Sequence, residues 1–413
     1  MTLDDVKKEV QEYIYMENTS MIDAALATII ANRISSGVPV WLVVVGASSG
    51  GKSQILKPLA LSDPEYMHRV DDITENTFLS GSQDSKKKGE DGDSVKSKSL
   101  LLRIGSHGMI VISDLTVLFS RGVESRNAIL SQFRMLYDGE MIKSVGTMST
   151  TLRWKGHLGI VAGSTPTIYQ HMEEVSDMGE RFMYWRMHEY DERKATKVAM
   201  SRKLQGSDLD DTLASIYSAY IKEIVKSGVR ATLTEKENDS IIDIAILAEK
   251  IRTSVKRDRY SKMVEHIPSP AFPMRTALQL KNIAEALAIM YGGSLGERGM
   301  QVIRWMGWSL ANEEKRRCLK FLAGQGYAVK TSTVADAVGL DTSVVKSILQ
   351  AMATVGLLLR SAEGSEHTWK IKEASDKDLI LKTIENKADA EVIKEREQTS
   401  DEVDIVDIDD IPF

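Results

Sequence analysis

The residues from Gly46 to Ser53, Gly-Ala-Ser-Ser-Gly-Gly-Lys-Ser, follow the spacing G-x-x-x-x-G-K-[S/T]. A β-branched run at 38–45 precedes them and a helical pattern follows. Glycines let backbone N–H groups turn inward around phosphate oxygens, and the positive end of the following helix strengthens this attraction. The lysine would reach the β- and γ-phosphates, and the final serine hydroxyl would bind Mg²⁺. The sequence therefore predicts a site for ATP and Mg²⁺ formed by Gly46, Ala47, Ser48, Ser49, Gly50, Gly51, Lys52 and Ser53.

An acidic residue ends a second apolar run. Residues 109–112 are Met-Ile-Val-Ile, and Ser113 and Asp114 follow them. An acid at such a strand end either holds Mg²⁺ through water or polarises the attacking water, so Asp114 is a candidate metal-binding and catalytic residue. A single acid leaves open which of the two tasks it performs. The candidates for the other task follow the next expected strand and are Asp71, Asp72 and Glu75.

Two further polar residues flank later apolar runs. Thr165 follows the run at 158–162, where its hydroxyl would orient the attacking water near the γ-phosphate. Arg181 lies in the sequence Gly-Glu-Arg-Phe and enters a fourth expected strand on the far side of the sheet. From there it does not easily reach its own nucleotide, but it would reach that of a neighbouring subunit, as an arginine finger supplied in trans. The alternatives are a simple strand-ending turn for Thr165 and a salt-bridged surface position for Arg181.

The elements that must position these residues are short buried strands separated by helical stretches. Strands are expected at 38–45, 109–112, 158–162 and 182–187, which favours an α/β fold with a mostly parallel sheet and helices on both faces. The expected division is an N-terminal helical segment at 1–36, an α/β nucleotide-binding core at 37–190, a helical lid at 191–310, a winged helix-turn-helix at 311–372 and an acidic flexible tail at 373–413.

The order of these elements resembles that of AAA+ ATPases, and more closely the minichromosome maintenance (MCM) helicases. The stretch 133–166 is similar to the family's region that runs through a pre-sensor hairpin into sensor 1, and Gly-Glu-Arg-Phe is similar to its Ser-Arg-Phe arginine finger. Pro273-Met-Arg275-Thr resembles the lid segment that carries the sensor 2 arginine, so Arg275 is a further candidate catalytic residue. Thr165 stands where the family has Asn, and Ser113-Asp114 replaces Asp-Glu.

The resemblance is closest to compact MCM-like ATPases of phages and mobile elements, and it implies a homo-hexameric ring that acts on DNA. In the hairpin that the resemblance predicts, Lys143 would point into the ring pore and contact phosphate, with Arg153 and Lys155 close behind. The alternative is that these are solvated side chains of a surface hairpin. The winged helix would bind either DNA or a protein partner.

The chain ends in an acidic and apolar segment. The last five residues resemble the C-terminal tip of bacterial single-stranded DNA-binding proteins, which in that family docks on replication and repair proteins. The aromatic side chain would fill an apolar pocket, its terminal carboxylate would pair with a basic group, and the acids would meet a basic rim. The alternative is a solubilising tail. The candidate partner-binding residues are Asp409, Asp410, Ile411, Pro412 and Phe413.

Composition limits the remaining classes of protein. The chain has 413 residues with 53 basic and 59 acidic side chains, and the resulting net charge of −6 at first argues against a nucleic-acid partner. Residues 401–413 carry six acids and no base, so residues 1–400 sum to zero and the deficit belongs to the tail. The single cysteine excludes a disulfide framework or Cys-based zinc cluster within one chain. No apolar run is long enough for a bilayer and no signal-peptide pattern is present, so we expect a cytoplasmic protein without a membrane partner.

The motifs, the resemblance and the composition leave two candidate functions of different classes. The first is an ATP-driven DNA motor, a helicase or translocase, in the replication of a phage or mobile element. The second is an AAA+ helicase loader or recombination adaptor that uses ATP as an assembly switch without unwinding DNA. A DNA-binding regulator with a degenerate ATPase is less favoured, because Lys52, Ser53 and Arg181 are all present.

Overall fold

The computed structural model describes residues 1–35, 37–48, 50–80, 99–145, 150–171, 181–255, 257–258, 270–363 and 366–384. Among the sequence predictions, Ser49, the first two residues of Gly-Glu-Arg-Phe and the whole Asp-Asp-Ile-Pro-Phe terminus lie outside these residues. The division into domains expected from the sequence stays a prediction.

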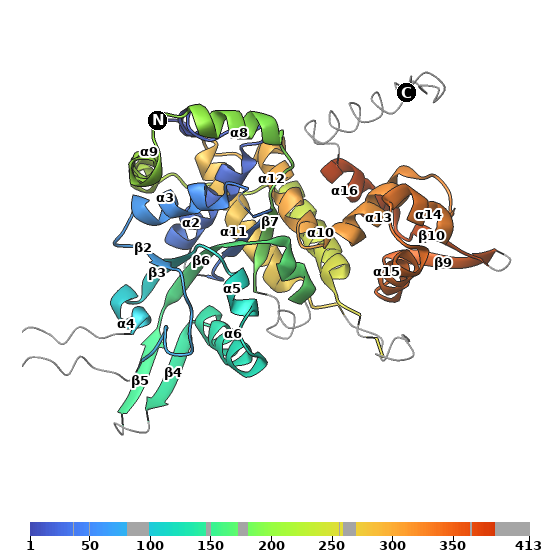
Figure 1. Ribbon diagram of the computed structural model, residues 1–413, viewed down its shortest axis with the longest axis horizontal. Helices are drawn as coiled ribbons and strands as arrows, with labels where there is room; N and C mark the ends of the chain where they lie inside the picture. Colours follow the sequence, from blue (N-terminus) through green and yellow to red (C-terminus); the bar gives the residue numbers. More distant parts are fainter. Residues whose placement is uncertain are drawn as a thin grey trace, which may run out of the picture.

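A five-stranded parallel sheet forms the centre of the fold, in the order β2-β3-β6-β1-β7 (Figure 1). All five residues of β1 and all eight of β6 are buried, as strands covered on both faces must be. The predicted parallel α/β fold is therefore confirmed, although two strands are longer than expected. The strands are β1 (Trp41–Val45), β2 (Met67–Val70), β3 (His107–Ile112), β6 (His157–Ser164) and β7 (Met183–Arg186).

Helices flank the sheet, and glycines in β6 allow two of them to come very close. A Cβ at Gly159 would lie 2.6 Å from Cγ of Asn32, and a Cβ at Gly163 would lie 3.1 Å from Leu56 Cδ1. Because residues four apart in a strand share a face, the helices that carry Asn32 and Leu56 cover the same face of β6. Those two helices are α2 (Ser20–Ile34) and α3 (Lys52–Ser62).

A two-stranded antiparallel ribbon projects from the lower end of the sheet in Figure 1. It consists of β4 (Glu140–Val145) and β5 (Thr150–Lys155), and it lies within the stretch where a hairpin was expected. Helix α6 (Val123–Tyr137) leads into it. The short helix α4 (Leu100–Ile104) precedes β3, whereas α5 (Thr116–Phe119) and the 3-10 helix η1 (Pro166–His171) follow the carboxyl ends of β3 and β6.

The second half of the described chain is mainly helical, as the sequence predicts. The apolar stripe of α9 is buried from Leu213 to Ile221, while Ile224 at its end is half-buried. The helices of this region are α8 (Glu192–Ser201), α9 (Gly206–Ser227), α10 (Glu235–Arg252), α11 (Met274–Met290) and α12 (Gly296–Trp308).

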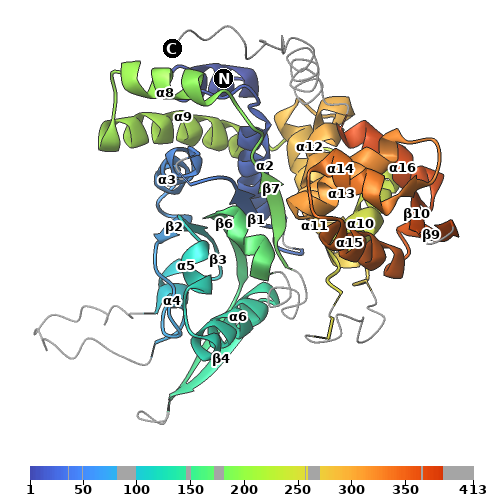
Figure 2. The same ribbon diagram turned by 45° about the vertical axis from the view of Figure 1, so that its right-hand side comes forward.

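The C-terminal elements lie together to one side of the sheet (Figures 1 and 2). Three short strands form an antiparallel sheet in the order β8-β10-β9, and Gly339 has a φ of 69° at the turn that separates two helices. The elements are α13 (Glu313–Gly324), β8 (Val329–Lys330), α14 (Thr331–Val338), α15 (Thr342–Thr354), β9 (Leu358–Glu363), β10 (Glu366–Ile371) and α16 (Ala374–Ile384).

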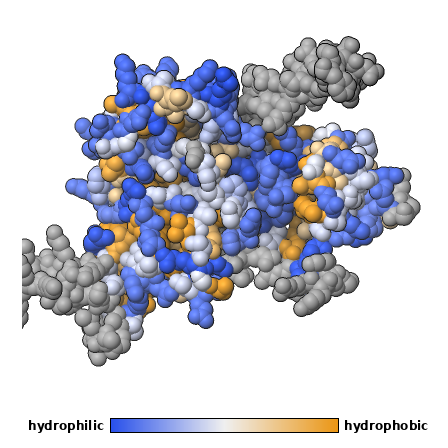
Figure 3. All heavy atoms as spheres, in the orientation of Figure 1, coloured by the Kyte–Doolittle hydropathy of each residue, from blue (hydrophilic) through white to orange (hydrophobic). Residues whose placement is uncertain are grey.

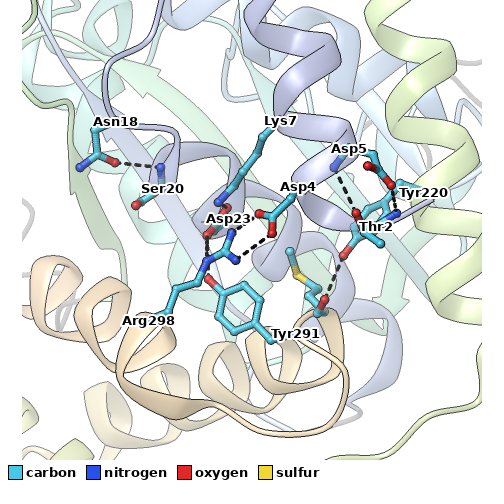
Figure 4. A network of polar contacts seen from close by, with 11 residues as sticks. Thr2, Asp4, Asp5, Lys7, Asn18, Ser20, Asp23, Tyr220, Tyr291 and Arg298 are labelled. Carbon is cyan, nitrogen blue, oxygen red and sulfur yellow. Dashed lines mark hydrogen bonds and ion pairs between the residues drawn. The ribbon is translucent and has the colours of Figure 1, made fainter.

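An ionic network, of which Lys7 and Asp23 are buried, joins the N-terminal helix α1 (Leu3–Gln11) to the helical half of the chain (Figure 4). The Lys7 ammonium pairs with Asp23 on α2, and the Tyr291 hydroxyl donates to Asp23 Oδ2 at 2.6 Å. Arg298 on α12 pairs with Asp4 at 2.6 Å. Burial lowers the pKa of Lys7, and Asp23 opposes that shift. The network therefore fixes α1 and α2 against the region of α11 and α12.

Hydrophilic and hydrophobic residues are mixed on the face that Figure 3 shows. Within the described ranges, none of the helices combines the length and the apolar character that crossing a membrane requires.

Asn32 is the buried polar residue that attaches the end of α2 to the start of β1. Its side-chain amide donates to the carbonyls of Thr28 and Val40 at 2.8 and 2.9 Å, and its Oδ1 accepts from the Val40 N–H at 3.0 Å. The side chain is 2% exposed. Its loss would leave the Val40 peptide groups buried without these partners, which is more costly than losing an exposed hydrogen bond.

We expect Asn32→Leu to lower the free energy of unfolding by about 2–4 kcal/mol, because several buried hydrogen bonds are lost at once. Chemical denaturation followed by circular dichroism measures this change. The matched control is Asn127→Leu at an exposed position of α6, which should change stability by less than about 0.5 kcal/mol. Equal stability of the two variants would contradict the prediction.

Candidate functional site

The glycine-rich loop connects the carboxyl end of β1 to the first residue of α3, as its sequence predicts. Gly51 precedes the helix with a φ of 83°, a left-handed conformation that favours glycine. The Gly46 N–H donates to the Ser164 carbonyl at 3.1 Å, which holds the start of the loop to β6. A Cβ at Gly46 would lie 2.7 Å from Met187 Sδ, so this position has little room for a side chain.

Lys52 is buried at the start of α3 and points back into the loop. Its Nζ donates to the carbonyls of Gly46 at 2.7 Å and Ala47 at 2.6 Å. Burial lowers the pKa of Lys52, and the negative charge of Asp114 opposes the shift. Asp114 is therefore part of the electrostatic environment of the lysine, although Lys52 begins α3 and Asp114 follows β3.

Asp114 lies just after β3, and Thr116 links it by hydrogen bonds to the end of the neighbouring strand β6. Its Oδ1 accepts from the Thr116 N–H at 2.8 Å. The Thr116 hydroxyl in turn lies 3.2 Å from Ser164 Oγ and 3.3 Å from Thr165 Oγ1, and it accepts from the Thr165 N–H at 3.1 Å. Sequence analysis missed Thr116, whose only signal is its place two positions after Asp114. Ser164 immediately precedes Thr165 at the same strand end.

The three acids that the sequence offers for the task not performed by Asp114 have different surroundings. Asp71 follows β2, and its Oδ1 accepts from Ser113 Oγ at 2.5 Å. Asp72 forms an ion pair with Arg121. The Glu75 side chain is exposed, and its carbonyl accepts from Lys143 at 3.0 Å. Of these acids, Asp71 is therefore the one whose carboxylate contacts the end of β3.

The candidate Mg²⁺ ligands are oxygen donors, as that ion prefers. Ser53 is exposed in the first turn of α3. The negative charge of Asp114 acts on Lys52, the residue before Ser53. Within the described ranges, no group of three or more His, Cys, Asp or Glu side chains is placed to hold a metal. The residues fit an ion that takes one or two protein ligands and completes its shell with water and phosphate oxygens, which is the usual arrangement for Mg²⁺.

A cavity of about 800 Å³ opens beside the loop, between it, the segment 13–18 and the residues that follow β7. This volume falls in the range of small-molecule sites. Its walls include Ser48 and Gly50 of the loop, Tyr13 and Met16 from the connection between α1 and α2, and Tyr190. Sequence analysis assigned no role to the last three residues, because nothing in their local pattern predicts that they meet the loop.

Arg181 and Arg275 lie together, away from Lys52. Arg181 precedes β7 and so lies at the amino ends of the parallel strands, whereas the loop is at their carboxyl ends. Its Nη2 donates to both carboxylate oxygens of Asp138 at 3.0 and 3.1 Å. The guanidinium carbons of Arg181 and Arg275 lie 5.3 and 5.6 Å from the centre of the Tyr137 ring. Arg181 therefore lies at the end of the sheet opposite the loop, and its action on a neighbouring subunit stays a prediction.

The basic residues of the ribbon have unequal surroundings. Lys143 Nζ donates to the carbonyls of Glu75 and Leu79 and to Asn76 Oδ1, each at 3.0 Å. Arg153 is exposed and pairs with Glu140 across the ribbon, with its Nε 2.7 Å from Oε1. Lys155 is exposed at the end of β5. Lys143 is thus held by its own chain, while the other two cations lie on the surface.

Comparison of the chain with protein-family models and with curated proteins finds no match.

His188 lies in the wall of the cavity and is largely buried. Its ring stacks on Trp305 of α12 with a centroid distance of 4.0 Å and an interplanar angle of 20°. Among the described residues, neither ring nitrogen has a hydrogen-bond partner. Burial lowers the pKa of His188 to about 4, and Arg316 adds to the effect.

This depressed pKa predicts a loss of stability in acid. The unfolded chain takes up a proton on this residue near its ordinary pKa of 6.5 and the folded chain only near 4, so the stabilisation is complete above pH 6.5 and lost as the pH falls towards 4. We expect His188→Phe, which keeps the stack on Trp305, to remove about 2 kcal/mol of the stability lost between pH 7 and pH 5. Urea denaturation at both pH values measures the difference. An unchanged pH dependence in the variant would contradict this assignment.

Proposed function

We propose that this protein is an ATP-hydrolysing, ring-forming DNA motor, a helicase or translocase of the AAA+ class that resembles compact MCM-like ATPases of phages and mobile elements. The observation that carries the proposal is the loop between β1 and α3, where the Lys52 ammonium points back to the carbonyls of Gly46 and Ala47 and the charge of Asp114 acts on it. A glycine-rich loop on a parallel sheet, followed by a helix N-terminus, binds the phosphates of a nucleotide.

In this proposal the loop and the strand ends divide the work of hydrolysis. The backbone N–H groups of 46–51 hold the phosphates, and Lys52 exchanges its two carbonyl partners for phosphate oxygens. A bound Mg²⁺ would neutralise charge on the β- and γ-phosphates, with Ser53 and Asp114 as its protein ligands. Thr116 fixes the positions of Asp114 and Thr165, and the cavity beside the loop takes the nucleoside.

The opposite end of the sheet supports assembly into a ring. Arg181 and Arg275 share the Tyr137 ring at the amino ends of the strands, where neither faces its own loop. When subunits stack head to tail, this end of one subunit meets the loop of the next, and both arginines stabilise the charge of the transferring phosphoryl group in trans. The homo-hexamer remains the proposed ring.

DNA is the proposed polymer in the pore of the ring. Arg153 and Lys155 lie on the projecting ribbon, and six copies around a ring would sum many weak phosphate contacts. The C-terminal elements from α13 to β10 have the order of a winged helix, for which we propose DNA or a protein as partner. We also propose that the terminus at 409–413 docks on host replication and repair proteins that bind single-stranded DNA-binding protein tails.

The second candidate is a helicase loader or adaptor that uses ATP only as an assembly switch. The observation that favours it is the position of Lys143. The predicted pore lysine donates to three acceptors of its own chain, which it would have to leave before it contacts a phosphate.

Substitution of the loop lysine tests the motor. We expect Lys52→Ala to lower ATP hydrolysis by a factor of about 10²–10³ and to abolish unwinding of a forked DNA duplex, because the phosphates lose their central cation. Phosphate release and strand displacement are the measurements, and Lys226→Ala at an exposed end of α9 is the matched control. If the protein hydrolyses ATP with DNA stimulation but never separates the strands, the adaptor is the correct function.

Mixing two inactive variants tests whether Arg181 acts in trans. Arg181→Ala alone should lower hydrolysis by about 10³. Mixed in equal amounts with Lys52→Ala, it should recover up to about a quarter of wild-type activity, because some interfaces then combine an intact Lys52 with an intact Arg181. Circular dichroism verifies that both variants are folded. No recovery in mixtures that form rings of wild-type size would show that the arginine does not act across the interface.

A further inference from the structure

Hydrolysis of a nucleoside triphosphate requires both neutralisation of phosphate charge and orientation of the attacking water. At the end of β3, Asp114 is the acid whose charge acts on Lys52. The residue before it, Ser113, is neutral but carries a hydroxyl with one proton and two lone pairs. That hydroxyl donates its proton to Asp71 Oδ1 at 2.5 Å, a short hydrogen bond of the charge-assisted kind.

The sheet itself brings these residues together. Val70 of β2 pairs with Ile112 of β3, and Asp71 and Ser113 are the next residues in that register. The positive charge of Lys57 on α3 also favours the ionised form of the Asp71 carboxylate. Arg69 also holds the carboxylate, with Nε 2.9 Å from Oδ1 and Nη2 2.8 Å from Oδ2.

We propose that Asp71, acting through Ser113, is a positioning residue for ATP hydrolysis, and that this pair replaces a second carboxylate at the end of β3. The inference rests on the function proposed above. Because the Ser113 proton is committed to Asp71, the serine lone pairs are left to accept a hydrogen bond from the attacking water. The negative charge of Asp71 polarises the hydroxyl and makes it a stronger acceptor than an isolated serine.

The pair orients the water and does not take its proton. The water oxygen bonds to the γ-phosphorus as the bond from that phosphorus to the bridging oxygen breaks. ADP leaves with the electron pair of that bond, and both water protons stay with the phosphate product. Although burial alone would raise the pKa of Asp71, the hydrogen bonds from Ser113 and Arg69 hold it below its ordinary value, so the carboxylate remains ionised through the reaction.

The first variant is Asp71→Asn, which keeps the shape of the side chain and removes its charge. We expect kcat for ATP hydrolysis to fall about a hundredfold, since the water loses its fixed orientation, while KM and the affinity for a fluorescent ATP analogue stay within about twofold. Glu65→Gln makes the same chemical change at an exposed position before β2 and should leave both quantities unchanged.

The second variant distinguishes a positioning role from a structural one. Adding Ser113→Asp to Asp71→Asn moves the carboxylate onto β3, and we expect it to restore at least about a tenth of the wild-type kcat. Wild-type kcat in Asp71→Asn, an equal loss of ATP affinity, or failure of the second substitution to restore activity would each overturn the inference. If the wild-type protein does not hydrolyse ATP, both the proposed function and this inference fail. If the wild-type protein is active and Asp71→Asn is equally active, only the role of Asp71 is refuted.

Discussion

Parallel pairing of β1, β6 and β3 is the constraint on which the candidate site depends. Val45 is opposite Ser164, and Ile112 is opposite Ala162, so the three strands end at nearly the same level. The chain must leave each strand at the same edge of the sheet. The glycine-rich loop, Asp114 and the threonine hydroxyls therefore meet there, although they are far apart in the sequence. β7 also pairs in parallel with β1, so Arg181, which precedes β7, lies at the opposite end of the sheet.

The parts of this fold that the sequence predicts are those with a local physical signal. Strands covered on both faces appear as continuous apolar runs, and the loop from Gly46 to Ser53 has a spacing that few other structures need. By contrast, β2 is only four residues long and contains His68 and Arg69, so its pattern is weak and its neighbour in the sheet is not evident.

The remainder of the site depends on register, which no local pattern encodes. Asp71 was one of three comparable acids until the pairing of β2 with β3 brought it to Ser113. Arg275 meets the Tyr137 ring because α11 packs where α6 ends, and the cavity acquires Tyr13 because α1 is fixed by buried ion pairs. These contacts come from packing between segments distant in the chain, as does the engagement of Lys143 with the carbonyls of Glu75 and Leu79.

The two carbonyls that hold Lys52 have a thermodynamic consequence. They give the buried ammonium hydrogen-bond acceptors within its own chain. In the nucleotide site proposed above, a phosphate would exchange one set of oxygen acceptors for another. The gain is therefore the difference between two good partners, and a single phosphate gains little. Selection for a chain of phosphates follows, because only a longer anion adds contacts along the backbone N–H groups beyond the lysine.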